Sequence, residues 1–286
     1  MTKTAFLGLG VMGFPMAGHL AAKGLDVTVY NRTVSKAQDW TAKHKGRAAA
    51  SPVEAVKGAD LVFACLGDDP DVEEMAAAIS GNIKPGAVVV DHTTASPALA
   101  RRLHALFACE GVGFVDAPVS GGQAGAENGK LSVMCGGDEP HVAAARPGME
   151  AYAARVVHIG PAGHGQLCKA VNQICIAGVL QGLSEGVHFA SRAGIDIERV
   201  LEAISGGAAQ SWQMENRAKT MAADKFDFGF AVDWMRKDLR IALAEARENG
   251  SRLPLTALID QYYGDVQAMG GGRWDTSSLI RRLKND

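Results

Sequence analysis

The chain has 286 residues, of which 47% are hydrophobic and 21% are charged, so it holds enough apolar side chains for one large or two ordinary domains. Its formal net charge of −2 excludes a broad basic field of the kind that attracts nucleic acid or a membrane surface. Five cysteines without a CxxC pair and eight histidines without an HxxxH or HExxH pattern argue against disulfides and a metal site, so we expect reduced thiols, no metal and a cytoplasmic location.

Strand and helix signals alternate through the first half of the chain. Short apolar or β-branched runs predict strands at residues 4–8, 27–30, 61–66, 88–90, 114–115, 131–135 and 156–159. Capping and periodicity predict helices at residues 12–23, 51–56, 71–79 and 97–109, with Ser51 as the N-cap of the second. This alternation predicts a doubly wound α/β domain around a mainly parallel sheet, which we place at residues 1–163.

The pattern changes after residue 165, where helix signals continue without a convincing strand. Residues 166–192 predict one long apolar helix of roughly 40 Å, which suits a spine that joins two domains and contacts another subunit. Its polar residues make it a poor membrane span, and the first residues of the chain lack the features of a signal peptide. Further helices are expected at residues 196–205, 211–222, 232–249 and 254–269. We place an all-helical domain at residues 164–286.

A glycine-rich loop follows the first predicted strand and opens the first predicted helix. In the sequence Gly8-Leu9-Gly10-Val11-Met12-Gly13, the first glycine permits a tight turn, the second lets the backbone approach a pyrophosphate, and the third allows close helix–strand packing. The helix start adds free N–H groups and a partial positive charge. Since a strand precedes the loop and a second strand follows about 20 residues on, the pattern predicts a dinucleotide-binding site.

The end of the second predicted strand indicates which dinucleotide binds. An NAD-selective site usually has an acidic residue there, whereas this chain has Asn31, Arg32 and Thr33. Arg32 can pair with a 2′-phosphate, and its two neighbours can donate hydrogen bonds to it. We therefore expect NADP as the cofactor, with NAD possible at lower preference. The alternative is an arginine in a solvated turn.

Residues 116–122, Asp-Ala-Pro-Val-Ser-Gly-Gly, follow a predicted strand and offer polar groups for a substrate. The Ser120 hydroxyl and the backbone N–H groups of Gly121 and Gly122 can together hold a carboxylate. A plain glycine-rich turn explains the same residues.

The long helix carries three polar side chains on one face, because Lys169, Asn172 and Gln173 are spaced at i, i+3 and i+4. Burying an ammonium is costly, so a cleft that binds an anionic substrate would explain a lysine in this helix. A low dielectric would also lower the pKa of that lysine and help it to donate a proton. A lysine that extends to the surface is the alternative.

Four motifs, taken in order, closely resemble the β-hydroxyacid dehydrogenase family. They are residues 8–17, 116–122, 160–173 and 237–239, and they extend across almost the whole chain. Members of this family include 3-hydroxyisobutyrate dehydrogenases, tartronate semialdehyde reductases and glyoxylate/succinic semialdehyde reductases. The resemblance implies a Rossmann domain followed by an all-helical domain, and a homodimer or homotetramer formed through the helical parts.

The resemblance also implies a role for individual residues. Lys169 would be the catalytic general acid in carbonyl reduction. The substrate-binding residues would be Ser120, Gly121, Gly122, Asn172 and Phe230. The cofactor-binding residues would be Gly8, Gly10, Val11, Met12, Gly13, Asn31, Arg32, Thr33, Leu66, Thr94 and Lys237.

We therefore expect an NADP-dependent oxidoreductase that interconverts a small 3-hydroxy acid and its semialdehyde. Acids of the 3-hydroxyisobutyrate, 3-hydroxypropionate, glycerate or serine type remain open, with a glyoxylate/succinic semialdehyde reductase as the alternative. Imine reductases usually replace Lys169 by Asp or Tyr, and non-catalytic relatives that bind chromatin have lost it, so both classes fit less well. Gln210, Ser211 and Trp212 are candidate specificity residues, although capping and packing explain them nearly as well.

Overall fold

The computed structural model describes residues 2–284 and divides into two compact units, Met1–Lys169 and Ala170–Asp286. The helix that begins at His164 ends the first unit and continues into the second. The domain boundary that the sequence predicts near residue 163 stays a prediction. We describe each unit by itself.

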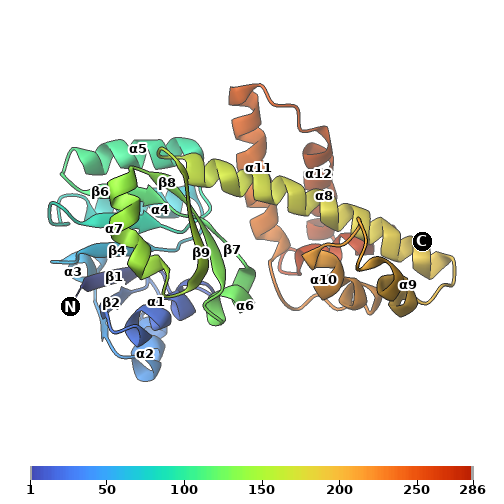
Figure 1. The fold of residues 1–286 in the computed structure, drawn as a ribbon, viewed down its shortest axis with the longest axis horizontal. Helices are drawn as coiled ribbons and strands as arrows, with labels where there is room; N and C mark the ends of the chain where they lie inside the picture. Colours follow the sequence, from blue (N-terminus) through green and yellow to red (C-terminus); the bar gives the residue numbers. More distant parts are fainter. Residues whose placement is uncertain (1, 285–286) are drawn as a thin grey trace. The chain divides into compact units, whose positions relative to one another are not determined.

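A mainly parallel sheet forms the centre of the first unit (Figure 1). Its strands are β1 (Lys3–Leu7), β2 (Asp26–Tyr30), β3 (Arg47–Ala48), β4 (Leu61–Ala64), β5 (Val88–Asp91), β6 (Gly113–Asp116), β7 (Val119–Ser120), β8 (Leu131–Gly137) and β9 (Ala153–Gly160). They lie in the order β3-β2-β1-β4-β5-β6-β8-β7, with β9 beside β8. The pairs from β3 to β6 are parallel, and β8 runs antiparallel to β6 and β7. This order confirms the predicted doubly wound fold.

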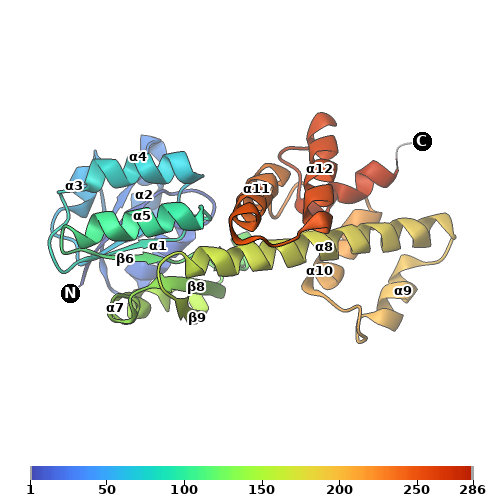
Figure 2. The same ribbon diagram turned by 90° about the horizontal axis from the view of Figure 1, so that it is seen from above.

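Helices cover both faces of this sheet, which is why the central strands β4, β5 and β6 are buried along their whole length. The helices are α1 (Gly13–Ala22), α2 (Val34–Lys43), α3 (Pro52–Val56), α4 (Asp69–Ile79), α5 (Pro97–Ala108), α6 (Gly122–Glu127) and α7 (Glu139–Met149). Apolar side chains of α1, α2 and α7 pack in one core, and those of α3, α4 and α5 pack in the other. Figure 2 shows α3, α4 and α5 on one side of the sheet and α7 on the opposite side.

The strand register brings the carboxyl ends of five strands to one edge of the sheet. Leu7 pairs with Tyr30 on one side and with Ala64 on the other. Asp91 then pairs with Ala64 and with Asp116. The loops that follow β1, β2, β4, β5 and β6 therefore meet at this edge, where doubly wound sheets bind their ligands.

Within the described residues of the second unit every named element is a helix, as the sequence predicts, and an isolated antiparallel bridge joins Ala231 to Asp275. Its elements are the continuation of α8 (His164–Arg192), α9 (Ile197–Ile204), α10 (Trp212–Ala222), α11 (Val232–Asn249), α12 (Pro254–Ala268) and the 3₁₀ helix η1 (Thr276–Leu283). Side chains of α8, α11 and α12 form its larger core around the fully buried Tyr263. Across residues 2–284, no helix is both long and apolar enough to cross a membrane.

One face of α8 is exposed and apolar. Val171 is 61% exposed and Phe189 is 70% exposed, and Val179 lies between them on the same face. The helix is therefore buried on part of its circumference, not all around it.

Candidate active site

The glycine loop joins β1 to α1 in the conformation that its sequence predicts. Gly8 has a φ of +95°, and a Cβ there would overlap the carbonyl oxygen of Cys65 at the end of β4. A Cβ at Gly13 would overlap the carbonyl oxygen of Gly8, so the third glycine lets α1 approach the loop. A Cβ at Gly10 would have no described atom within 4 Å. The loop therefore leaves open space at its second glycine.

The start of α1 is suited to an anion. The first amides of a helix have no acceptor within the helix. Among the described residues, no side chain accepts from them as a cap, because the N-cap position is occupied by Met12. The uncapped helix start and the open space at Gly10 fit the pyrophosphate of a dinucleotide.

Asn31 and Arg32 at the end of β2 make different contacts. The Asn31 Oδ1 atom accepts a hydrogen bond from the Leu9 backbone N–H at 2.8 Å, and its Nδ2 donates to the Thr33 carbonyl oxygen at 3.1 Å. The Arg32 side chain is 82% exposed and lies 3.7 Å from the Asp71 carboxylate. Asn31 thus joins the glycine loop to β2, while the Arg32 cation stays mostly exposed next to Asp71 in the first turn of α4.

The loops after β4 and β5 are joined by hydrogen bonds. The Leu66 N–H donates to Thr93 Oγ1 at 2.9 Å, and the Thr93 N–H donates to Asp91 Oδ1 at 2.9 Å. The Gln166 side chain, from the first turn of α8, donates to the Thr93 carbonyl at 2.7 Å and accepts from the Ala95 N–H at 3.1 Å. Predicted cofactor residues Leu66 and Thr94 therefore lie on loops that are fixed to each other and to α8.

Asp116 joins the end of β6 to the start of α8. Its Oδ1 accepts from the Gly163 N–H at 2.7 Å and its Oδ2 accepts from the Gln166 N–H at 2.9 Å. Burial raises the pKa of Asp116 to about 6, and the backbone N–H groups offset part of this rise by stabilising the carboxylate. A Cβ at Gly136 would lie 2.5 Å from Asp116 Oδ1, so the neighbouring strand has room only for a glycine.

Lys169 lies beside the segment that was predicted to bind a carboxylate. Its side chain is buried, and Nζ donates to the Val119 carbonyl oxygen at 3.0 Å. Ser120 is the next residue, and Gly121 and Gly122 follow with φ values of +128° and +61°. The first unit therefore brings a lysine amine next to a turn that exposes backbone N–H groups, as the motif predicts.

The buried His92 holds the backbone just before Ser120 by a hydrogen bond. His92 Nδ1 lies 2.6 Å from the Ala117 carbonyl oxygen, so this nitrogen donates, and its Nε2 lies 2.7 Å from the Tyr152 hydroxyl. Burial lowers the pKa of His92 to about 4, which keeps the ring neutral. With the proton on Nδ1, Nε2 accepts from Tyr152. The imidazole thus fixes the backbone that leads to Ser120.

In the second unit, predicted site residues share one chain of hydrogen bonds. Asn172 Nδ2 donates to Gln173 Oε1 at 2.8 Å, and Gln173 Nε2 donates to Asp238 Oδ2 at 2.6 Å. The Lys237 Nζ lies 3.2 Å from Asp238 Oδ1. Because the Gln173 amide is held at both ends, the orientation of the Asn172 carboxamide follows from that of Gln173.

Phe230 belongs to a different cluster of the second unit. Its backbone N–H donates to Asp275 Oδ2 at 3.0 Å, and Asp275 Oδ1 lies 3.2 Å from the Arg217 guanidinium. The guanidinium stacks on the rings of Trp212 and Phe228, at 5.0 and 4.8 Å from their centroids. Buried Asp275 therefore fixes the loop that carries Phe230.

The candidate specificity residues next to this cluster have structural partners. Ser211 caps α10 by accepting from the Met214 N–H at 3.0 Å, and Gln210 donates to Glu215 at 2.7 Å. Capping thus accounts for Ser211, and Trp212 covers Arg217.

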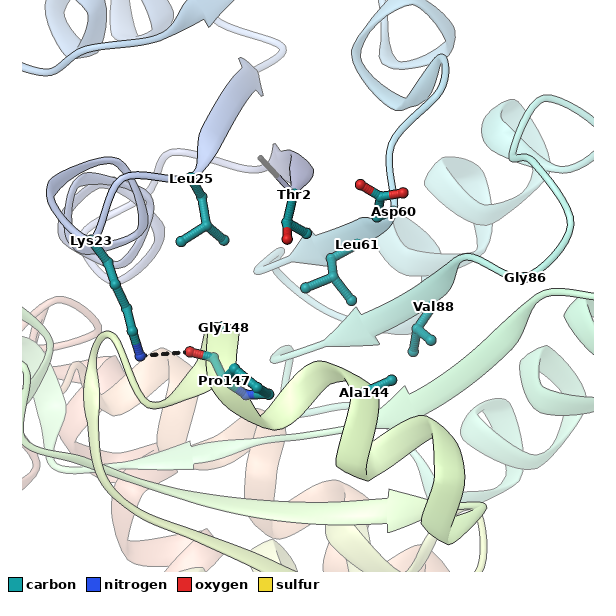
Figure 3. A pocket seen from close by; sticks show the side chains of 10 residues that line it. All are labelled: Thr2, Lys23, Leu25, Asp60, Leu61, Gly86, Val88, Ala144, Pro147 and Gly148. Carbon is teal, nitrogen blue, oxygen red and sulfur yellow. Dashed lines mark hydrogen bonds between the residues drawn. The ribbon is translucent and has the colours of Figure 1, made fainter.

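A pocket of about 390 Å³ lies at the opposite edge of the sheet, and Figure 3 shows the side chains that line it. It is lined by residues at the amino ends of β1, β4 and β5, and the Lys23 Nζ donates to the Pro147 carbonyl oxygen there at 2.8 Å. Its position separates it from the glycine loop and from Lys169. Within residues 2–284, no group of His, Cys, Asp and Glu side chains is arranged to hold a metal ion.

Comparisons with known proteins match the whole chain. The family model for the NAD binding domain of 6-phosphogluconate dehydrogenase covers residues 3–160, and the model for NAD-binding of NADP-dependent 3-hydroxyisobutyrate dehydrogenase covers residues 163–283. The chain is 58% identical to an uncharacterized oxidoreductase of Shewanella frigidimarina, with 99% of each chain covered. It is 40% identical to a probable mitochondrial 3-hydroxyisobutyrate dehydrogenase-like protein of Arabidopsis thaliana, over 99% of this chain and 85% of the relative.

A solved structure agrees with these relatives. The 3-hydroxyisobutyrate dehydrogenase of Mycobacterium tuberculosis with L-serine has a TM-score of 0.91 at 31% identity, with all of both chains covered. The chain belongs to the β-hydroxyacid dehydrogenase family. This β-hydroxyacid dehydrogenase is thus an NAD(P)-dependent oxidoreductase that acts on CH–OH groups, which confirms the predicted family and enzyme class.

The β-hydroxyacid dehydrogenase also contains site residues whose roles sequence reasoning missed. Asp116 was part of a predicted motif but had no role of its own, and Gln166 was noted only as the start of the long helix. Asp275 was not considered at all. A polar residue in the first turn of a very apolar helix was the available signal for Gln166, and the sequence Asp-Thr-Ser was a capping signal for Asp275.

Proposed function

We propose that this β-hydroxyacid dehydrogenase interconverts a small 3-hydroxy acid and its semialdehyde with NADP as its preferred cofactor. The observation that carries the proposal is the hydrogen bond from Lys169 Nζ to the Val119 carbonyl, directly before the Ser120–Gly122 turn. A proton donor and an anion-binding turn in one place suit a substrate that has both a carboxylate and a reducible carbonyl. The names of the relatives support this substrate class.

The residues proposed to hold the cofactor lie at the carboxyl edge of the sheet. Gly8, Gly10, Val11, Met12 and Gly13 would bind the pyrophosphate, and Leu66 and Thr94 would line the path to the nicotinamide. Arg32 would pair with the 2′-phosphate, with Asn31 and Thr33 beside it, and the match to a model of an NADP-dependent enzyme supports this preference. When bound, the nicotinamide supplies a hydride for reduction and takes one up in oxidation.

The chain's own residues would hold the substrate and move the proton. The Ser120 hydroxyl and the N–H groups of Gly121 and Gly122 would bind the carboxylate. Lys169 Nζ would give a proton to the carbonyl oxygen as a hydride reaches its carbon, and would recover that proton from solvent. In oxidation the amine would take the hydroxyl proton instead. Asn172 would position the reacting oxygen beside Lys169.

Two residues of the second unit complete the proposed set. Phe230 would border the substrate and Lys237 would contribute to cofactor binding. Both residues have defined positions, because Asp275 fixes the backbone of Phe230 and Asp238 pairs with Lys237.

We further propose that the enzyme is a homodimer or homotetramer and that the exposed face of α8 is part of its interface. Val171, Val179 and Phe189 form an apolar surface on one helix, which a second copy would cover. Light scattering after size exclusion tests this. Phe189→Glu should lower the oligomeric state, whereas the exposed Arg199→Glu on α9 should leave it unchanged. A Phe189→Glu variant with wild-type mass would contradict the interface.

A nucleic-acid partner is not part of the proposal, and the cytoplasmic location stays a prediction.

A spectrophotometric screen of NADPH oxidation and NADP⁺ reduction tests the function. The panel contains short semialdehydes and 3-hydroxy acids, serine, glyoxylate and succinic semialdehyde. Preference for glyoxylate or succinic semialdehyde would replace the proposed substrate class by the alternative one, and turnover of imines alone would replace it by an imine reductase.

Lys169→Ala provides the decisive variant. We expect kcat to fall by about 100-fold or more, the usual contribution of a general acid, while the Kd for NADPH stays within about twofold. Lys57→Ala, which removes an exposed lysine after α3, is the matched control and should behave as wild type. Unchanged turnover in Lys169→Ala would overturn the assignment of this lysine.

A further inference from the structure

Gln166 uses both ends of its carboxamide on the loop that follows β5. Nε2 donates to the Thr93 carbonyl and Oε1 accepts from the Ala95 N–H, at 2.7 and 3.1 Å. The side chain is 2% exposed, so water does not compete for these bonds. A single side chain thus satisfies a donor and an acceptor of the backbone on both sides of Thr94.

The same amide is connected to the loop after β4. Thr93, whose carbonyl accepts from Gln166, also accepts from the Leu66 N–H through its hydroxyl at 2.9 Å. The start of α8 is therefore tied to both loops that are proposed to line the cofactor path. Lys169 follows Gln166 by less than one helical turn, so the position of the Lys169 backbone depends on where Gln166 holds the start of the helix.

Contacts from the other side hold the same turn of α8. The Gln166 N–H donates to Asp116 Oδ2 at 2.9 Å. A Cβ at Gly165 would overlap the carbonyl oxygens of Met134 and Asp116, so the backbone of α8 packs directly on β6 and β8. The helix start has a defined position in the first unit, and the Gln166 carboxamide is its link to the cofactor loops.

We propose that Gln166 is a positioning residue that sets the Lys169 amine relative to the loops of Leu66 and Thr94. The proposal rests on the proposed function, because the lysine and these loops are assigned there. Proton and hydride must reach adjacent atoms of one substrate, and a displacement of about 1 Å can lower the rate by about 100-fold. Gln166 acts through Lys169 and the loops without touching the reacting atoms.

Gln166→Met tests the role of the amide, since methionine has a similar length and no hydrogen-bonding amide. We expect kcat to fall by about 10- to 100-fold while the Kd for NADPH stays within about threefold. Gln181→Met is the matched control, because Gln181 is a 7% exposed glutamine of the same helix whose amide donates to Glu185 one turn along. Equal kcat values for Gln166→Met, Gln181→Met and wild type would overturn the proposal.

Gln166→Glu gives a readout that a loss of packing would not produce. A neutral carboxyl group has one donor and one acceptor and can make both bonds of the amide. A carboxylate has no proton to donate to the Thr93 carbonyl, and it is repelled by the Asp116 carboxylate. The ratio of mutant to wild-type kcat should therefore fall as pH rises and the carboxyl group introduced in the variant loses its proton. The elements around this side chain also carry Asp91, His92, Asp116 and Lys169, and dividing by wild-type kcat removes the part of the pH dependence that both proteins share. A ratio that is independent of pH would contradict the proposal.

Hydrogen exchange separates this proposal from the proposed function. In the protein without substrate, the Ala95 amide should exchange faster in Gln166→Met than in wild type and at the wild-type rate in Gln181→Met. If wild type turns over nothing in the panel, the proposed function fails, and the exchange rate still decides whether Gln166 fixes the loop. Unchanged exchange at Ala95 would overturn the positioning role even in an active enzyme.

Discussion

Asn31 and Leu9 join the second strand to the glycine loop, because the Asn31 carboxamide oxygen accepts the Leu9 N–H at 2.8 Å. The sequence predicted Asn31 as a direct ligand of a 2′-phosphate. In the structure the Asn31 oxygen instead accepts a hydrogen bond from the loop, and Nδ2 donates to the Thr33 carbonyl oxygen. The residue thus shapes the loop that is proposed to bind the pyrophosphate, a part that NAD and NADP have in common.

The first prediction follows from this bond. Asn31→Leu should weaken binding of NADPH and NADH alike by about tenfold, as expected for the loss of about 1.4 kcal/mol from one partly buried hydrogen bond. Fluorescence titration of both cofactors measures the effect. Asn31→Asp keeps the acceptor for Leu9, so NADH should bind it within about threefold of wild type. Wild-type affinities in Asn31→Leu would show that the loop keeps its shape without this bond.

The second prediction concerns Arg32 and the choice between NADP and NAD. Arg32→Glu should lower the NADP/NAD ratio of kcat/KM by about 10- to 100-fold, since a charge-assisted bond to the phosphate is replaced by repulsion. Arg47→Glu is the control, because Arg47 pairs with Asp26 at the start of β2, far along the strand from Arg32. A ratio that Arg32→Glu leaves unchanged would place the source of cofactor preference elsewhere.

Gly10 and Gly13 should respond differently to the same substitution. Gly10→Ala adds a methyl group where no described atom lies within 4 Å, so its melting temperature should match wild type while NADPH binding weakens by about tenfold or more. Gly13→Ala forces a Cβ onto the Gly8 carbonyl and should lower the free energy of unfolding by about 1–3 kcal/mol. Calorimetry and cofactor titration distinguish the two effects. Normal NADPH binding by Gly10→Ala would exclude a close approach of the pyrophosphate there.

Asp116 makes stability depend on pH in a direction that is unusual for a carboxylate. Its pKa in the folded protein is about 6, above the ordinary value of 3.8, so the folded state binds this proton more tightly than the unfolded chain. The contribution of Asp116 to the free energy of unfolding should therefore fall as pH rises from about 4 to about 6, by up to about 3 kcal/mol. Asp116→Asn should remove this loss. The free energy of unfolding of wild type minus that of Asp116→Asn should therefore decrease as pH rises over that range.

Urea unfolding between about pH 4.5 and about pH 7.5 measures this difference. Asp60→Asn is the control of opposite sign, because a hydrogen bond from Lys84 lowers the pKa of Asp60. Its contribution is lost only as pH falls below the ordinary value, so Asp60→Asn should shift stability by a constant amount within the measured range. Parallel curves for wild type and Asp116→Asn would mean that Asp116 does not titrate there.

Local signals predicted much of the fold. The apolar runs and caps located β1, β2, β4 to β6, β8 and β9, and Ser51 caps α3 through the Glu54 N–H as expected. The helices that sequence reasoning passed over have weak local signals. In α2 only Ala37 and Trp40 are buried, and α7 contains Pro147, which is unfavourable inside a helix. The strands β3 and β7 have two residues each, too few for a period-2 pattern.

Sequence reasoning named candidate site residues where the groups lie close together in the chain, and their roles stay predictions. The glycine loop and the Ser120–Gly122 turn are local motifs whose chemistry follows from spacing. The bonds of Gln166 to Thr93 and of Asp116 to Gly163 join residues that lie far apart in the chain and meet only in the sheet. No periodicity encodes such pairs, so these positioning contacts required the structure.

The hydrogen bond from Lys169 to Val119 has a consequence for the proton transfer proposed for this lysine. The Val119 carbonyl accepts this bond from Nζ, and a backbone carbonyl carries no formal charge. An ammonium and a neutral amine can each donate to such an oxygen. The bond can therefore persist through a full cycle of proton loss and recovery, so one resting position of the side chain would serve the proposed proton transfer in both directions.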